Sequence, residues 1–139
     1  MDDQSLRPGG QIQSSRRIAR YQPIRFAAAL SDFNPLHIDR ELAVMMGLPD
    51  LPLQPEGLVP LIEQLIEQRI QPDDALAAVD VRFAAHAVQG QLLDFELMGD
   101  RLDGNVLVCR FTVKDQATEG LIAEGEVFIR NAVTGSQQQ

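Results

Sequence analysis

The chain is poor in cysteine, histidine and tryptophan, and two of these scarcities exclude kinds of site. Its 139 residues include one cysteine, Cys109, two histidines and no tryptophan. A single cysteine excludes an intrachain disulfide and a cysteine-based zinc cluster. Two histidines argue against a histidine-rich metal site. We therefore expect no metal centre.

Long apolar runs and an excess of basic charge are also missing. No run approaches the roughly 20 apolar residues of a membrane span. The first ten residues, MDDQSLRPGG, lack the apolar centre of a signal peptide. With 12 basic and 20 acidic residues, the net charge of −8 repels phosphate backbones and anionic membranes. We expect a cytoplasmic protein with neither a nucleic acid nor a membrane as partner.

What the chain does contain is typical of one ordinary globular domain. Hydrophobic residues make up 45% and charged residues 23% of the sequence, and the length suits a single domain. We expect that domain over residues 1–130, followed by a polar, disordered tail at residues 131–139. Residues 1–17 are polar, with a turn at Pro8-Gly9-Gly10, and no helix or strand is assigned to them.

Four stretches near the C-terminus alternate apolar and polar residues. They cover residues 79–85, 91–99, 105–113 and 120–130. This alternation predicts half-buried antiparallel strands, with Cys109 on an apolar face. Glycine-containing turns separate the stretches, so we expect the four strands to follow one another as a meander.

Residues 55–70 carry the clearest helical pattern. Apolar residues recur at spacings of three and four: Leu58, Leu61, Ile62, Leu65, Ile66 and Ile70. Pro55 suits the first turn of a helix. A helix of this kind can lie across a one-sided sheet and close its core. The pattern therefore predicts an α+β fold, with an antiparallel sheet wrapped around one long helix.

The stretch FAAALSDFNPLHIDRELAVMMG, residues 26–47, concentrates the polar chemistry. Asn34-Pro35 interrupts a first helix, and Asp39 can cap a second one that ends before Gly47. The loop between them holds Asp32, Asn34, His37 and Asp39. We expect Met45 and Met46 on the second helix to pack in the core.

Two interpretations of this loop are open from its spacing alone. Asp32 and His37 can form a general acid–base pair, because histidine titrates near physiological pH and a carboxylate can share the proton transfer. Alternatively, Asp32 and Asp39 are helix caps and His37 is a structural hydrogen-bonding residue.

The full string SDFNPLHIDRELA resembles the hydratase motif of the MaoC-like family of (R)-specific enoyl-CoA hydratases and 3-hydroxyacyl dehydratases. The matching positions are Asp32, Asn34, Pro35, His37 and Asp39. An alanine-rich helix ending in Leu-Ser precedes the motif, and a glycine, Gly57, stands at the start of the long helix. The resemblance covers about residues 11–130 and implies the hotdog fold, a curled antiparallel sheet around one helix.

The resemblance also implies roles for individual residues. Asp32 and His37 would be the catalytic dyad, and the backbone N–H of Gly57 would stabilise the thioester oxyanion. Asn34 would shape the loop or bind ligand. Glu56, which stands where the family usually has a histidine, would add a carboxylate near the substrate.

The implied substrate is a thioester of coenzyme A or of an acyl carrier protein, and no cofactor is implied. Four arginines, Arg16, Arg17, Arg20 and Arg25, could bind coenzyme A phosphates or form a solvated face. We expect a homodimer, because a single curled sheet exposes a face and an edge. A heterodimer with a second hotdog chain, acting as a partner-dependent or non-catalytic subunit, and a hotdog thioesterase are the alternatives.

Overall fold

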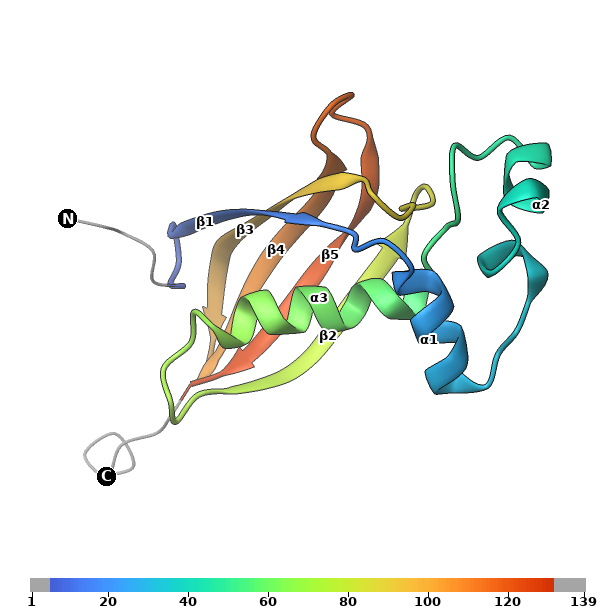
Figure 1. Cartoon of the computed structure of the whole chain (residues 1–139). Coiled ribbons are helices and arrows are strands. Elements are labelled where there is room, and N and C mark those ends of the chain that lie inside the picture. Colours follow the sequence, from blue (N-terminus) through green and yellow to red (C-terminus); the bar gives the residue numbers. More distant parts are fainter. Residues whose placement is uncertain (1–5, 132–139) are drawn as a thin grey trace.

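A computed structural model describes residues 6–131 of the chain (Figure 1). The expected tail at residues 131–139 thus lies outside the described residues, apart from Asn131. The elements, in chain order, are β1 (Gln11–Arg17), α1 (Gln22–Leu30), η1 (Pro35–His37), α2 (Arg40–Met45), α3 (Pro55–Glu67), β2 (Ala75–Phe83), β3 (Leu92–Asp103), β4 (Val106–Asp115) and β5 (Leu121–Arg130).

The long helix α3 lies across the concave side of the curled sheet, as its apolar pattern predicts (Figure 1). Pro55 occupies its first turn, where the missing N–H breaks no helical bond. The side chains it buries against the strands are Leu58, Ile62, Leu65 and Ile66. One element therefore closes the core of the sheet, in agreement with the predicted α+β architecture.

The five strands form one antiparallel sheet in the order β1-β3-β4-β5-β2. The expectation of a four-strand meander is correct for β3, β4 and β5 and wrong for β2, which pairs with β5 at the far edge. Two residues connect β3 to β4, whereas eight residues lead from β2 to β3. In that long connection, Ala84 and Ala85 donate to the carbonyl of Ile122. Alternation of apolar and polar residues predicts which side chains of a strand are buried, but it does not predict which other strands pair with it.

Strand β1 was not expected from the polar sequence of residues 1–17. It pairs with β3, and only one of its side chains, Ile12, is buried. Gln11 and Gln13 donate to the carboxylate of Glu96 on β3. An edge strand with one apolar anchor and outward polar side chains has too little alternation to be recognised from sequence.

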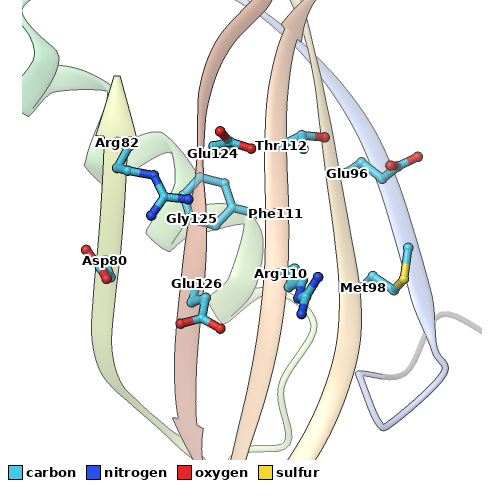
Figure 2. A pocket seen from close by; sticks show the side chains of 10 residues that line it. All are labelled: Asp80, Arg82, Glu96, Met98, Arg110, Phe111, Thr112, Glu124, Gly125 and Glu126. Atoms are coloured by element: carbon cyan, nitrogen blue, oxygen red, sulfur yellow. The ribbon is translucent and has the colours of Figure 1, made fainter. Parts of the chain in front are cut away.

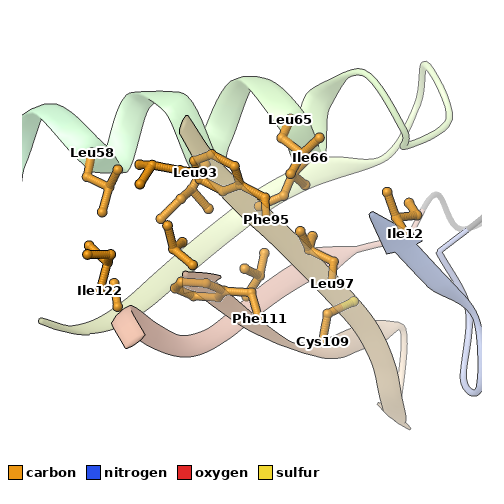
Figure 3. Packing of buried hydrophobic residues seen from close by; sticks show 14 of the residues in the cluster. Ile12, Leu58, Leu65, Ile66, Leu93, Phe95, Leu97, Cys109, Phe111 and Ile122 are labelled. Carbon is orange, nitrogen blue, oxygen red and sulfur yellow. The ribbon is translucent and has the colours of Figure 1, made fainter. Parts of the chain in front are cut away.

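The core is one cluster between α3 and the strands (Figure 3). Leu93, Phe95 and Leu97 of β3 meet Leu65 and Ile66 of α3 there. The predicted position of Cys109 in this core is confirmed, because it is 0% exposed. Burial, together with the charge of Asp100, raises the pKa of its thiol to about 11, so the thiol stays protonated and inert at neutral pH.

Membrane-spanning helices and metal clusters are absent from residues 6–131. No helix there is long and apolar enough to cross a bilayer. In the same part of the chain, no group of three or more histidine, cysteine, aspartate or glutamate side chains lies close enough together to hold a metal ion.

Candidate functional site

Asp32 follows α1 directly and lies in an exposed position. Helix α1 begins at Gln22 and ends at Leu30, and its C-cap residue, Ser31, has a φ of 53°, in the left-handed region. This reversal lets the N–H of Asp32 donate to the carbonyl of Ala27 at 2.9 Å. The carboxylate of Asp32 forms no hydrogen bond with any residue in the described range. It is therefore held by its backbone and open to a ligand.

His37 sits at the end of η1 and is buried, with 8% of its surface exposed. Its Nδ1 lies 2.8 Å from the carbonyl oxygen of Pro52. A carbonyl only accepts, so Nδ1 carries the hydrogen and donates it. In the neutral ring Nε2 is then the unprotonated nitrogen, with no partner in the described chain. This bond fixes the tautomer and leaves one nitrogen for chemistry.

Asn34 and Asp39 both cap helices. Asn34 Oδ1 accepts from the N–H of Leu36 at 3.1 Å and starts η1. Asp39 Oδ1 accepts from Glu41 and Leu42 at the first turn of α2. The capping interpretation is confirmed for Asp39. For Asn34 the expected loop-shaping role is observed, and its amide nitrogen has no partner among the described residues.

Gly57 and Glu56 lie in the first turn of α3. Glu56 is exposed, and its side chain contacts neither Asp32 nor His37 through a hydrogen bond in the described chain. Gly57 is buried, and its N–H donates to the carbonyl of Gln54 at 2.8 Å. A Cβ at Gly57 would stand 2.9 Å from Leu53 Cδ1. The amide that the resemblance makes an oxyanion donor is thus already bonded, and it would have to be shared with a ligand oxygen.

Pro52 and Gln54 are two parts of the site that sequence reasoning did not find. Pro52 acts through its backbone carbonyl, which no side-chain pattern reveals. Gln54 is 2% exposed, and its Nε2 donates to the carbonyl of Pro23 on α1 at 3.1 Å. Its Oε1 is buried without a partner in the described chain. Gln54 therefore connects α1 to the start of α3 beside the loop.

The segment that carries this loop, residues 19–54, exposes most of its large apolar side chains; we call it the site segment. Eight of the eleven exposed large hydrophobic residues in the described chain belong to it: Tyr21, Ile24, Leu30, Phe33, Ile38, Val44, Met45 and Met46. The expectation of core packing is wrong for Met45 and Met46, which are 82% and 67% exposed. Helix α2 lies beyond the end of the sheet (Figure 1), and none of its residues belongs to the core cluster.

A hollow of about 580 Å³ lies on the outer face of the sheet, opposite α3 (Figure 2). Its side chains are the polar partners in the strand alternation, among them Arg82, Arg110, Glu124 and Glu126. Neither Asp32 nor His37 lines it. The second histidine, His86, is exposed beyond the end of β2 and also lies outside this hollow.

Comparison of the whole chain with known proteins finds relatives by structure only. No family model matches the sequence, and none of the curated proteins does. Among solved structures, the unliganded R-hydratase PhaJ1 from Pseudomonas aeruginosa has a TM-score of 0.80 and 24% identity, over 91% of this chain and 82% of that chain. The (R)-hydratase from A. caviae has a TM-score of 0.80 and 23% identity, over 93% and 99%.

Structures of two-component complexes are similar as well. The ChsH1-ChsH2 complex from Mycobacterium tuberculosis has a TM-score of 0.79 and 14% identity, over 90% of this chain and 98% of that chain. At these identities the likeness establishes the fold. The chain has the expected hotdog fold, with an antiparallel five-strand sheet around one helix.

Proposed function

We propose that this protein is an (R)-specific enoyl-thioester hydratase, or a 3-hydroxyacyl-thioester dehydratase in the reverse direction, acting on acyl groups carried by coenzyme A or by an acyl carrier protein. The observations that carry the proposal are the anchored Nδ1 of His37, which leaves Nε2 without a partner in the described chain, and the unpartnered Asp32 five residues earlier on the same loop. The hydratase-like motif and the hydratase structures of the same fold support it.

The dyad would divide the proton transfers of hydration. The Asp32 carboxylate takes a proton from a water molecule as the water oxygen attacks C3 of a trans-2-enoyl thioester. His37, doubly protonated at that moment, gives its Nε2 proton to C2, while Nδ1–H stays on the Pro52 carbonyl. Asp32 then returns its proton to His37, so the net addition is one water molecule. Dehydration follows the same steps backwards.

The thioester oxygen gains negative charge during this addition and needs a donor. We propose the start of α3 for this role, where the N–H of Gly57 can be shared between Gln54 and the oxyanion. Asn34 would contact the substrate through its unpartnered amide nitrogen, and Glu56 would border the acyl group from the exposed first turn of α3.

A second chain would complete this site. The sheet ends in two unpaired edges, β1 and β2, and the site segment leaves its apolar side chains uncovered. We propose a homodimer. The alternative, a heterodimer with a second hotdog chain, draws support from the ChsH1-ChsH2 complex among the similar structures.

The test is a hydration assay on enoyl thioesters of several chain lengths, on both carriers, with wild type, Asp32→Asn and Asp39→Asn. Removing a general acid–base group costs roughly 100- to 10,000-fold in rate, and we expect that loss for Asp32→Asn at an unchanged melting temperature. Asp39→Asn is the matched control on the same loop, because asparagine caps helices as well as aspartate does.

The other outcomes separate the alternatives. Release of free thiol without hydration would identify a thioesterase. Activity that requires a co-purified second hotdog chain would replace the homodimer by a heterodimer. A wild type inactive on every thioester, with or without a partner chain, would refute the proposal.

A further inference from the structure

Gln54 is a buried polar side chain whose amide is satisfied on one side only. Within residues 6–131, His37 and Gln54 are the two polar residues that are buried. The Oε1 of Gln54 has no partner in that part of the chain, and a buried acceptor without a partner costs free energy. A methionine, which has about the same length, would fill the space without this cost. The hydrogen bond of Nε2 therefore has to account for a glutamine at this position.

That bond joins the start of α3 to the first turn of α1, which lies beside it (Figure 1). Gln54 Nε2 donates to the carbonyl of Pro23 at 3.1 Å, and Pro23 is itself buried. A helical carbonyl also accepts the N–H four residues later, which here belongs to Ala27. The carbonyl of Ala27 in turn accepts the N–H of Asp32 at 2.9 Å. A continuous series of hydrogen bonds therefore leads from the Gln54 side chain to the backbone of Asp32.

Two other parts of the candidate site are held by the backbone of the same short stretch, residues 52–54. The carbonyl of Pro52 accepts from Nδ1 of His37 at 2.8 Å. The carbonyl of Gln54 accepts from the N–H of Gly57, also at 2.8 Å. Helix α1 is held differently, because the Gln54 bond is the one side-chain hydrogen bond in the described chain that joins it to a later part of the sequence. The place of Asp32 relative to His37 therefore depends on the Gln54 side chain.

We propose that Gln54 is a positioning residue, which fixes α1 against the start of α3 and thereby places the Asp32 carboxylate relative to His37. This inference rests on the proposed function and adds to it a residue that touches neither the substrate nor the reacting atoms. In the proposed hydration, Asp32 and His37 act at adjacent carbon atoms of one enoyl group. A shift of α1 would move one of these groups and leave the other in place. Misplacement by about 1 Å can cost about 100-fold in rate.

Amide hydrogen exchange, measured by NMR on the full chain, tests this link without any turnover. The variant is Gln54→Met, and the matched control is Gln68→Met, because Gln68 is exposed at the other end of α3. The substitution at Gln54 removes the donor and the unpartnered acceptor together, and the carbonyl on α1 keeps its helical bond. We therefore expect a melting temperature within about 4 °C of wild type.

The exchange rates should change in α1 alone. In Gln54→Met the amide of Ala27 should exchange about fivefold faster than in wild type, because α1 opens more often. The amide of Ile66 in α3 should keep its wild-type rate. Gln68→Met should alter neither rate.

Kinetics on the enoyl thioesters test the consequence for catalysis. Gln54→Met should lower kcat about tenfold and leave KM within about twofold, because substrate binding is kept and the geometry of proton transfer is lost. Gln54→Glu is a second variant, whose protonated carboxyl can donate to the carbonyl of Pro23 as the amide does and whose ionised form cannot. Burial raises the pKa of a carboxyl. The kcat of Gln54→Glu, relative to wild type at the same pH, should therefore rise from pH 8 to pH 5.

The outcomes distinguish this inference from the proposed function. A wild-type kcat in Gln54→Met would overturn the positioning role and leave the hydratase standing. A loss of kcat with equally faster exchange at Ala27 and Ile66 would do the same, because it marks a general loss of stability. If Gln54→Met does not fold, Gln54→Glu decides, and a kcat ratio that does not change with pH would overturn the role. Faster exchange confined to α1, in a protein that hydrates no thioester, would support the link between α1 and α3 and refute the proposed function.

Discussion

The sheet with α3, which we call the body, and the site segment of residues 19–54 place their apolar side chains in opposite ways. In the body, Ile62 and Leu93 are 0% exposed within one continuous cluster. In the site segment, Phe33 and Met45 are 59% and 82% exposed, although both regions belong to one short chain. The body is stabilised by its own packing, whereas the site segment leaves most of its large apolar side chains exposed. Substitutions should therefore separate stability from function between the two regions.

The largest expected effect is a cavity in the body. Ile62→Ala should lower the free energy of unfolding by about 2–5 kcal/mol, because the tightly packed core cannot close around the lost atoms. Met45→Ala should change it by less than about 0.5 kcal/mol. Urea unfolding of both variants measures the difference. Equal losses would mean that Met45 is covered, by a second chain, in the protein as it exists in solution.

A second effect, specific to the body, comes from Cys109. Its pKa rises from 9.0 to about 11 on burial, so the unfolded chain loses the thiol proton first. The thiol's contribution is fully present below pH 9 and is lost as the pH rises toward 11, by about 2–3 kcal/mol. Unfolding of wild type and Cys109→Ala, compared at pH 8 and pH 11, should show the gap between them narrow by that amount. A constant gap would contradict the burial of the thiol.

Gly125 in the body and Gly57 at the start of α3 differ in how much room each leaves for a Cβ. A Cβ at Gly125 in β5 would lie 1.8 Å from the carbonyl oxygen of Asp80 in β2, and the strands cannot yield without losing their pairing. Gly125→Ala should cost about 1–3 kcal/mol. At Gly57 the nearest atom is the end of the flexible Leu53 side chain, and alanine favours helix, so Gly57→Ala should cost less than about 1 kcal/mol. Thermal unfolding should give a lower melting temperature for Gly125→Ala than for Gly57→Ala. The reverse order would contradict the close approach of Gly125 to the Asp80 carbonyl.

A smaller effect than those of the Ile62, Cys109 and Gly125 substitutions is expected inside the site segment. Asn34→Ala removes the cap of η1 and should cost about 1 kcal/mol, whereas Asn34→Asp keeps an accepting oxygen and should cost little. The hydration rate of Asn34→Ala should fall by more than about fivefold, which is the factor that about 1 kcal/mol corresponds to. We expect this because the cap positions His37 at the end of η1. If both variants keep full activity, the cap has no part in positioning the dyad.

The body could be predicted from the sequence wherever a repeat spans many residues. Helix α3 and strands β3, β4 and β5 each repeat their apolar positions often enough to fix both type and buried face. Strand β1 has one buried side chain, Ile12, and was missed. The place of β2 beside β5 was missed because strand order is decided by α3 and the long connection, and not by alternation.

A local motif proposes Asp32 and His37 as site residues, and it also predicted the Asp39 cap, which is observed. The main-chain contacts of the candidate site could not be predicted from the sequence. The bond from His37 to Pro52 and the occupied amide of Gly57 involve main-chain atoms, which every residue type provides. Met45 and Met46 were assigned to the core because hydrophobic residues on a helix usually pack inside, yet α2 lies beyond the sheet.

The carbonyl that holds His37 is itself part of a short ladder. Pro52 pairs with Val88, and the flanking residues exchange bonds, since Leu53 donates to Ala87 and Gln89 donates to Leu51. The orientation of the His37 imidazole therefore depends on residues 87–89, about fifty positions further along the chain, because they hold the backbone of Pro52 in place. Substitutions at residues 87–89 should therefore alter how His37 is held, with every side chain of the candidate site unchanged.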